Sequence, residues 1–279
     1  MNKDISKAVR KLLPIKLKQL ILKLPHYSKS NPFIQINKIC PDYNVSDFFL
    51  FRQGEYETRF IAENNLALLV TKKIECEHQF IFFNSRGTQC GTLLVSSKEF
   101  HHKLEITNNT ITDEPFGSFI HQTKYSKKNL LENNINSSGI VFQHRGYAGY
   151  RKKNNKILST VHGNFGAVFQ HDKNIRSFAK QRINHRYTPQ VIFSGDTFYE
   201  LAFSNPTSKE LRIQLFIVQD NMDEKLYITK SIEPLGTVII ELPTSIILEN
   251  YNISWVSKLP IGRCLVFSHR KNNLDVFHS

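Results

Sequence analysis

Long apolar runs and regularly spaced cysteines are both missing from this sequence of 279 residues. Because no stretch of about 18 consecutive apolar residues occurs, the sequence predicts no membrane-spanning helix. The cysteines form no C-x-x-C pair and show no regular spacing, which disfavours a disulfide framework and a structural zinc site. We therefore expect reduced thiols in the core at Cys40, Cys76, Cys90 and Cys264.

Sequence motifs for catalysis and for nucleotide binding are also missing. The chain contains no nucleophile elbow, no P-loop and no G-x-G-x-x-G fingerprint. No His-x-His pair marks a metal site, and on a strand the adjacent His101 and His102 would point to opposite faces. We expect neither a metal ion nor a cofactor, and these absences favour a protein that is not an enzyme.

Alanine and methionine are scarce, whereas aromatic residues are abundant. The chain has only 2 Met but 21 Phe and 10 Tyr, and aromatic and β-branched residues favour strands over helices. From Phe33 onward, short apolar runs alternate with turn residues, and no long helical pattern separates them as in a parallel α/β sheet. Examples of these predicted strands are "LALLVT" (66–71), "QFIFF" (79–83), "ELRIQLFIVQ" (210–219) and "GTVIIEL" (236–242).

A polar and basic stretch, residues 171–189, shows no strand alternation and divides the predicted strands into two groups. We therefore predict an all-β fold of two tandem antiparallel β-sandwich units, jelly-roll or Ig-like, behind an N-terminal amphipathic helix. The predicted parts are a basic leader over 1–30, a first sandwich over 31–170, a linker over 171–189 and a second sandwich over 190–279.

The leader carries more than half of the formal net charge of +13, since its 30 residues include eight basic residues and one acid. In "MNKDISKAVRKLLPIKLKQLILKLP", apolar residues recur with the i, i+3, i+4, i+7 spacing of an amphipathic helix, with a bend at Pro14. Two interpretations stay open: the helix packs on the protein's own strands, or it lies on an anionic membrane. The predicted membrane contacts are Lys7, Arg10, Lys11, Lys16, Leu17, Lys18, Leu20 and Ile21.

Over about its first 25 residues, the Lys/Leu spacing of the leader resembles the basic helices that open many bacterial glycosyltransferases and methyltransferases of surface-polysaccharide pathways. The resemblance implies a role in surface-polysaccharide metabolism beside a membrane. The stretch "LILKL" is too short for the apolar region of a signal peptide, and no small-residue cleavage site follows it. We therefore expect a cytoplasmic protein that is peripheral on the inner face of the membrane.

Two stretches share a pattern, "VFQHRGYAGYRKKNNKILSTVHG" (141–163) and "VFSHRKNNLDVFHS" (266–279). In each, an apolar strand leads to His-Arg, a Lys-Asn-Asn turn reverses the chain, and a second strand ends at a histidine. We interpret the pattern as a duplicated hairpin that closes each sandwich, with His144 matching His269 and His162 matching His278.

The spacing of residues in the second hairpin leads to two further predictions. A turn centred on Asn272 and Asn273 places Arg270 opposite Asp275, a favourable pair of charges across the strands. Leu274, Val276 and His278 alternate with polar residues, so they share the apolar face of the last strand.

The hairpins are the predicted binding surface, because tyrosine rings stack on sugar faces and arginines bond to sugar hydroxyls or to anions. We predict a non-enzymatic protein that binds a glycan or another anionic ligand at the membrane. The predicted ligand-binding residues are His144, Arg145, Tyr147, Tyr150, Arg151, His162, His269, Arg270 and His278.

Two alternatives stay open. The first is a sugar-modifying enzyme with metal chemistry or with histidine acid–base chemistry, in which a hairpin histidine pairs with Asp196, Glu200 or Asp275. The second is a nucleic-acid-binding protein, because "GYRKKNNK" interleaves tyrosines with basic residues as a phosphate-facing patch does.

Overall fold

The computed structural model describes residues 45–111, 114–132, 143–144, 146–153, 155–171, 174–177, 179–189, 193, 197–218, 224–243, 252–259, 263–270 and 273–279. Strands dominate these residues, so the fold is all-β, as the composition predicts. Two short helices accompany the strands, α5 (Asn65–Val70) and α6 (Lys127–Glu132). The predicted leader helix lies outside the described residues. Within the described ranges, no helix is long and apolar enough to cross a membrane.

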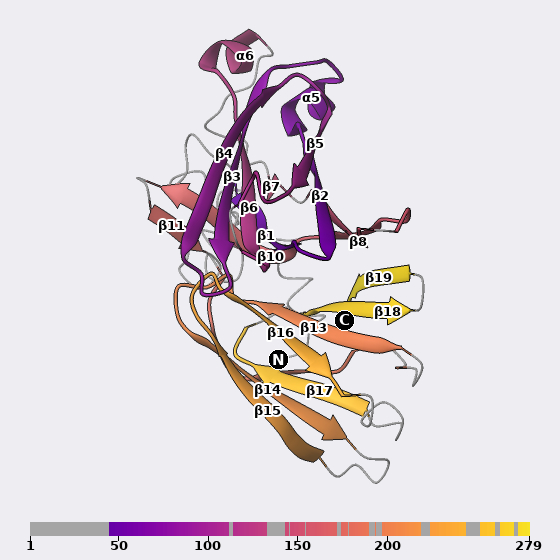
Figure 1. The fold of residues 1–279 in the computed structure, drawn as a ribbon. Helices are drawn as coiled ribbons and strands as arrows, with labels where there is room; N and C mark the ends of the chain where they lie inside the picture. The colour runs from indigo at the N-terminus through magenta and orange to yellow at the C-terminus, as the bar shows by residue number, and fades with distance from the viewer. Residues whose placement is uncertain are drawn as a thin grey trace, which may run out of the picture.

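The first eleven strands form two sheets in the upper half of Figure 1. The first sheet has the order β11-β10-β1-β6-β3-β4, with β7 parallel to β1, and the second has the antiparallel order β5-β2-β8-β9. The strands are β1 (Val45–Arg52), β2 (Tyr56–Glu63), β3 (Cys76–Asn84), β4 (Gln89–Ser97), β5 (His101–Ile106), β6 (Phe116–Lys124), β7 (Gln143–His144), β8 (Tyr147–Lys152), β9 (Ser159–His162), β10 (Asn164–His171) and β11 (Asn174–Ser177).

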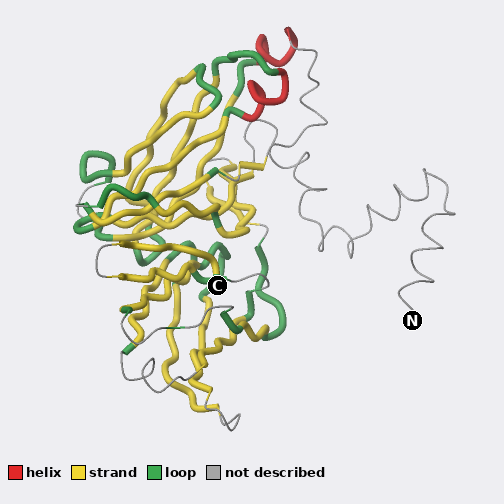
Figure 2. Tube along the Cα trace, turned by 90° about the vertical axis from the view of Figure 1, so that its right-hand side faces the viewer, coloured by secondary structure: helices red, strands yellow, loops and turns green. Residues whose placement is uncertain are grey.

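The remaining strands form two further antiparallel sheets in the lower half of Figure 1. The third sheet has the order β16-β13-β18-β19, and the fourth has the order β12-β17-β14-β15. The strands are β12 (His185–Tyr187), β13 (Phe198–Ser204), β14 (Leu211–Val218), β15 (Glu224–Ile232), β16 (Thr237–Leu242), β17 (Asn252–Ser257), β18 (Leu265–Arg270) and β19 (Asn273–His278). Figure 2 shows the same two bodies of strands from the side.

Alternate side chains of the third sheet point into two different cores, because successive residues of a strand face opposite sides. On β13, Leu201 packs in the core between the third and fourth sheets, whereas Ala202 joins the core of the first two sheets. On β18, Val266 and Phe267 divide in the same way. The continuous apolar run of β18 is thus explained by burial on both faces, and the third sheet is a layer that the two β-sandwich-like halves share.

Polar contacts add to this shared core. Ser159 Oγ, on β9, accepts a hydrogen bond from the backbone N of Val276, on β19, at 2.8 Å and donates one to the carbonyl oxygen of the same residue at 3.1 Å.

Gly87, in the β3–β4 turn, has a φ of +77°, and a Cβ atom there would lie 1.8 Å from the carbonyl oxygen of Pro234. Only glycine fits this close approach. The halves therefore contact each other at several separate points.

The structure corrects two local predictions. The run "LALLVT" is not a strand: residues 65–70 form α5, because the Asn64 side chain caps the helix by accepting a hydrogen bond from the backbone N of Ala67. The predicted linker, residues 171–189, is not free of strands, since β11 pairs with β10 and β12 pairs with β17. The chain passes between the halves after β11 and before β12.

The predicted equivalence of His144 and His269 is wrong. His269 lies on β18 and faces Leu274 in the β18–β19 hairpin, whereas His144 lies on β7, which runs parallel to β1. The strand before the first Lys-Asn-Asn turn is β8, which pairs with β9. The residues that the two segments have in common therefore lie on strands with different partners. The two hairpins are not equivalent when His144 is aligned with His269.

Candidate functional site

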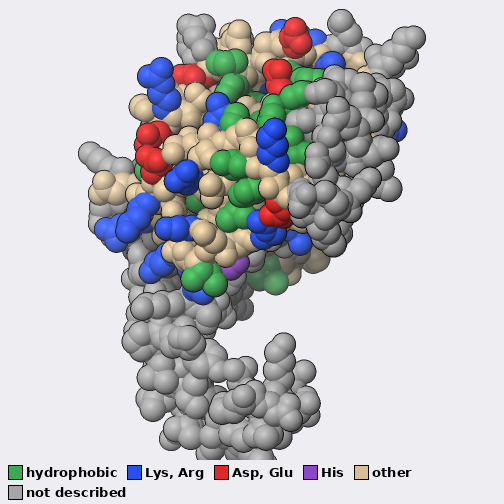
Figure 3. All heavy atoms as spheres, turned by 90° about the horizontal axis from the view of Figure 1, so that it is seen from below, with side chains coloured by type: hydrophobic (Ala, Val, Ile, Leu, Met, Phe, Trp, Pro, Cys, Tyr) green, Lys and Arg blue, Asp and Glu red, His purple; other side chains and the backbone are tan. Residues whose placement is uncertain are grey.

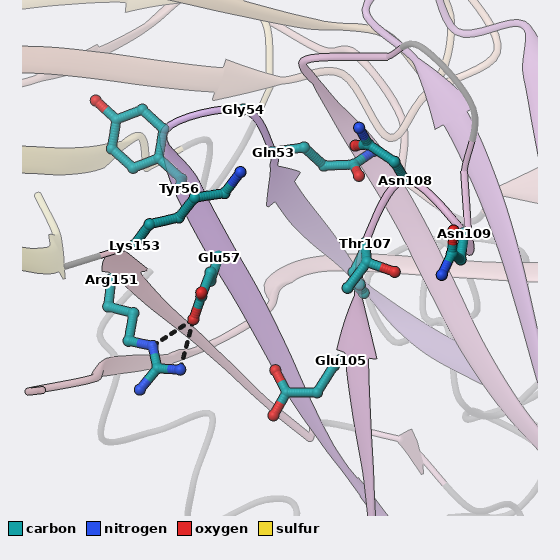
Figure 4. Close-up of a pocket in the computed structure, with 11 residues that line it drawn as sticks. Gln53, Gly54, Tyr56, Glu57, Glu105, Thr107, Asn108, Asn109, Arg151 and Lys153 are labelled. Atoms are coloured by element: carbon teal, nitrogen blue, oxygen red, sulfur yellow. Dashed lines mark hydrogen bonds and ion pairs between the residues drawn. The ribbon is translucent and has the colours of Figure 1, made fainter. Parts of the chain in front are cut away.

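A hollow of about 540 Å³ opens beside the second sheet (Figure 4), and we call it the polar hollow. Its walls come from the β1–β2 turn, the start of β2, the end of β5 with the following turn, and the end of β8. The lining residues are Gln53, Gly54, Tyr56, Glu57, Glu105, Ile106, Thr107, Asn108, Asn109, Arg151 and Lys153. Most of these residues carry amide, hydroxyl or charged groups, which suits the recognition of a ligand rich in hydroxyl groups.

The β1–β2 turn is held in place by a buried threonine. Thr58 Oγ1 donates a hydrogen bond to the carbonyl oxygen of Arg52 at 2.8 Å and accepts one from the Arg52 backbone N at 2.9 Å. Gly54 has a φ of +77°, a conformation that side-chain-bearing residues rarely adopt. This local geometry fixes Gln53 and Tyr56 on the two sides of the turn.

Gln53 has an unsatisfied acceptor at the polar hollow. Its side-chain N donates to the carbonyl oxygens of Ile111 at 3.3 Å and Glu114 at 3.1 Å, while its Oε1 has no partner within the described ranges. Gln53 is only 6% exposed, and an unsatisfied buried acceptor costs about 1–3 kcal/mol. Figure 4 shows the side chain reaching toward Asn108. A hydroxyl or an N–H group of a ligand would satisfy this oxygen.

Tyr56 gives the polar hollow its aromatic wall. The Arg52 guanidinium lies 3.7 Å from the centre of the Tyr56 ring, a cation–π distance. Burial raises the pKa of Tyr56 to about 12, with a further rise from Glu200, whose Oε2 accepts from the hydroxyl at 3.4 Å. The ring therefore stays neutral at physiological pH and is held rigidly from behind.

Two ion pairs cross the floor of the polar hollow. Arg151 on β8 lies directly opposite Glu57 on β2, and Arg151 Nη2 is 2.5 Å from Glu57 Oε2 (Figure 4). Glu105 on β5 pairs with Arg59 on β2. Both carboxylates are thus paired with arginines, which favours their ionised form and does not suit a carboxyl group that must act as a general acid.

The turn after β5 contributes two exposed amides to the polar hollow. Asn108 and Asn109 are exposed in the turn after β5, whose shape is fixed by the Thr107 carbonyl oxygen accepting from the backbone N of Thr110 at 2.8 Å. Their side-chain amides therefore present donors and acceptors to a ligand without being needed to hold the turn.

A buried ionic cluster lies behind Tyr56 and joins the two halves. Arg52 donates to both carboxylate oxygens of Glu200, at 2.6 and 3.0 Å, and His269 Nε2 donates to Glu200 Oε2 at 2.6 Å. Burial alone would raise the pKa of Glu200, but hydrogen bonds from His269 and Arg52 and the charge of Arg52 lower it to about 2. The geometry is that of a structural ion pair, because all three side chains are nearly inaccessible to solvent.

Of the predicted ligand residues on β8, the structure brings Arg151 to the polar hollow, whereas Tyr147 is exposed at the opposite end of the strand and does not line the hollow. The prediction for Tyr150 is wrong, since its ring is fully buried and its hydroxyl donates to the carbonyl oxygen of Leu50 at 2.8 Å. His144 is on β7, at the first sheet, and Arg145 lies outside the described residues. All predicted membrane contacts also lie outside the described residues.

The other predicted ligand residues lie away from the polar hollow. His162 and His278 stack with ring centres 4.4 Å apart, and His278 Nε2 donates to the carbonyl oxygen of His162 at 2.9 Å. His269 is held by Glu200, so its predicted role as a ligand residue is replaced by a contact between the halves. Arg270 Nε lies 3.7 Å from Asp275 Oδ2, which confirms the predicted pair, although the residue directly opposite Arg270 is Asn273.

Buried histidines also gather inside the first half. His78 Nδ1 and His121 Nε2 are 2.8 Å apart, and the ring of His102 stacks on His78. Burial, with a smaller contribution from His102, lowers the pKa of His78 to about 4. Among the residues that the structure describes, no three His, Cys, Asp or Glu side chains are arranged to hold a metal ion.

No sequence pattern marked Gln53, Tyr56, Asn108 and Asn109 as site residues. The turn signals "RQGEY" and "TNNT" flank strands that are distant in the chain but adjacent in the second sheet. Predicting the polar hollow requires the β2–β5 and β2–β8 pairings, which periodicity alone does not specify.

Comparisons with known proteins leave the chain without an assigned family. No family model and no curated protein matches it. One similar structure contains the M60 catalytic domain with the CBM51-1 and CBM51-2 domains of Clostridium perfringens ZmpB, at 6% identity and a TM-score of 0.18, with 83% of this chain and 33% of that chain covered. Another is the infectious bursal disease virus, Gt strain, at 12% identity and a TM-score of 0.15, with 82% and 57% covered. Such low TM-scores support no conclusion about function.

Proposed function

We propose that the protein is a non-enzymatic glycan-binding protein and that the polar hollow is its binding site. The observation that carries the proposal is the buried Oε1 of Gln53, an acceptor without a partner inside the described part of the chain, at a wall lined by exposed amides. Sugar hydroxyls donate and accept hydrogen bonds at once, so they match a mixed lining of amides and a hydroxyl. The neutral ring of Tyr56 adds an apolar surface for a sugar face.

Binding of soluble oligosaccharides, followed by isothermal titration calorimetry, tests the proposal. Replacing both Asn108 and Asn109 by alanine removes two exposed amides, and we expect about tenfold weaker binding, at about 0.5–1.5 kcal/mol for each lost hydrogen bond. Gln89→Ala is the matched control, because Gln89 is an exposed amide on β4 that does not line the polar hollow. Equal affinity of the double variant and the unaltered protein would refute the proposal.

The proposal places the protein on the inner face of an anionic membrane, in surface-polysaccharide metabolism. The support for this is the basic amphipathic pattern of residues 1–25, where each basic residue near an anionic surface contributes about 1 kcal/mol. We expect the full chain to sediment with vesicles containing anionic lipid and to be released by high salt, whereas a variant that lacks residues 1–25 stays in the supernatant. Partition of both proteins into the supernatant would remove the membrane part of the proposal.

The two alternative functions are not favoured by the site. None of the described histidines lines the polar hollow, and His269 bonds to Glu200, which also pairs with Arg52 in the buried cluster. In the patch predicted to bind nucleic acid, Tyr150 is buried in the core and Arg151 pairs with Glu57, so neither side chain is available to a nucleic acid. On the face nearest β14 and β15, Lys and Arg side chains are scattered among carboxylates and apolar groups rather than gathered in one patch (Figure 3).

A further inference from the structure

The charges that line the polar hollow leave one cation over. Glu57 pairs with Arg151, and Glu105 pairs with Arg59, so each lining carboxylate already has an arginine. Lys153 also lines the polar hollow, and it has no carboxylate partner among the residues that the structure describes. Lys153 is therefore a lining cation that no described carboxylate contacts, although the lining itself holds two carboxylates and two cations.

Lys153 is positioned by its backbone rather than by its side chain. Its N–H donates to the carbonyl oxygen of Glu55 at 3.0 Å, which closes the pairing of β2 with β8 just beyond Lys152. Figure 4 shows the side chain extending along Tyr56, with the ammonium group directed toward the Gln53 side of the polar hollow. Lys153 and Gln53, whose Oε1 is buried without a partner in the described part of the chain, thus line the same hollow.

We propose, on the basis of the glycan-binding function above, that the bound sugar carries an anionic substituent that pairs with Lys153. A hydroxyl or N–H group of the same ligand donates to Gln53 Oε1. An acidic sugar supplies both groups at once, an anion for the ammonium group and a hydroxyl donor for the glutamine oxygen. Carboxylate, sulfate and phosphate share the required charge, and the experiment distinguishes them.

Affinity measured on the full chain with matched tetrasaccharides tests this inference. The probes are cellotetraose and its uronic acid, sulfated and phosphorylated counterparts, each titrated at low and at physiological salt. We expect an acidic probe to bind at least tenfold more tightly than cellotetraose, with the difference reduced by salt. Whichever acidic probe binds most tightly identifies the substituent.

Lys153→Gln separates this pairing from general electrostatic attraction. The variant keeps a polar side chain at an exposed position, so the fold is expected to be retained, and equal thermal stability checks this. We expect it to lose about tenfold in affinity for the acidic probe and to bind cellotetraose unchanged. Lys156→Gln is the matched control, since Lys156 is an exposed lysine of the same hairpin that does not line the polar hollow.

The outcomes separate this inference from the proposed function. Equal affinity for neutral and acidic probes, or an equal loss in both lysine variants, overturns the pairing with Lys153 and leaves glycan binding intact. Binding of no probe, or binding that is insensitive to the loss of Asn108 and Asn109, overturns the proposed function itself.

Discussion

At the scale of single residues, Glu200 is a buried carboxylate at the contact between the two halves. It is 5% exposed, and it accepts hydrogen bonds from Arg52 and His269. Removing one partner of a buried ion pair leaves the other charge uncompensated, which is more costly than the pair itself is stabilising. The variant Glu200→Gln leaves the Arg52 guanidinium in that situation.

We therefore expect Glu200→Gln to lower the free energy of unfolding by about 3 kcal/mol at pH 7. The folded-state pKa of Glu200, about 2, lies below the ordinary value of 4.5, so the stabilisation is fully present above pH 4.5 and is lost as the pH falls toward 2. Urea unfolding of the variant and of the unaltered protein at pH 7, 4.5 and 3 measures both effects, and the difference should shrink at pH 3.

Glu99→Gln is the control for this prediction. Glu99 pairs with Lys73 at 2.9 Å, but both side chains are more than half exposed, and exposed pairs contribute about 0–1 kcal/mol. A loss at Glu200 no larger than the loss at Glu99, or a difference that does not change with pH, would contradict the proposed buried pair.

At the scale of elements, α5 shows how one capping residue overrides strand propensity. Asn64 is fully buried, its Oδ1 accepts from the backbone N of Ala67 at 3.2 Å, and its Nδ2 donates to the carbonyl oxygen of Ile74 at 2.6 Å. The capping bond begins the helix, and the second bond fixes the chain that leaves it. Residues 66–71 resemble a strand in composition, but Asn64 before them is a typical N-cap residue and indicates a helix.

We expect Asn64→Ala to lower the free energy of unfolding by about 2 kcal/mol, because it removes a helix cap and leaves a buried carbonyl oxygen without its donor. Urea unfolding gives the total, and hydrogen exchange shows whether α5 opens locally. Asn129→Ala, on α6, removes an exposed hydrogen bond to the Glu75 carbonyl oxygen and should cost less than about 1 kcal/mol. Equal costs at the two positions would argue against the capping role.

Most of the strands could be predicted from the sequence, but their partners could not. The runs at 79–83, 210–219 and 236–242 fall on β3, β14 and β16. They could be predicted because a strand buried on one face alternates apolar with polar residues, and a strand buried on both faces is continuously apolar. The predicted equivalence of His144 and His269 is wrong, because two segments with the same residues can pair with different neighbouring strands. Arg151 was predicted as a site residue from local composition, whereas Gln53 depends on contacts between distant strands.

At the scale of the whole molecule, the third sheet makes the two halves one cooperative unit. Phe267 on β18 is fully buried in the core of the first two sheets, and its ring lies edge-on to Tyr150 with centres 5.3 Å apart. The preceding residue of the strand, Val266, points to the opposite face and belongs to the other core. A substitution on either face of β18 should therefore lower the stability of both halves.

We expect Phe267→Ala to lower the free energy of unfolding by about 3–5 kcal/mol and thermal unfolding to remain a single transition. Hydrogen exchange should show equal loss of protection in β3 and β14, which lie in different halves. Ile183→Ala, at a position 75% exposed, is the control and should change little. Two separate thermal transitions, with only one shifted by Phe267→Ala, would show that the halves fold independently.

The shared third sheet has a consequence for synthesis on the ribosome. Leu265, Phe267, Leu274 and Val276 complete the core of the first two sheets, yet β18 and β19 are the last described strands to be translated. The nascent first half must wait with an apolar face open to solvent until these strands emerge, which favours chaperone binding and slow, late folding.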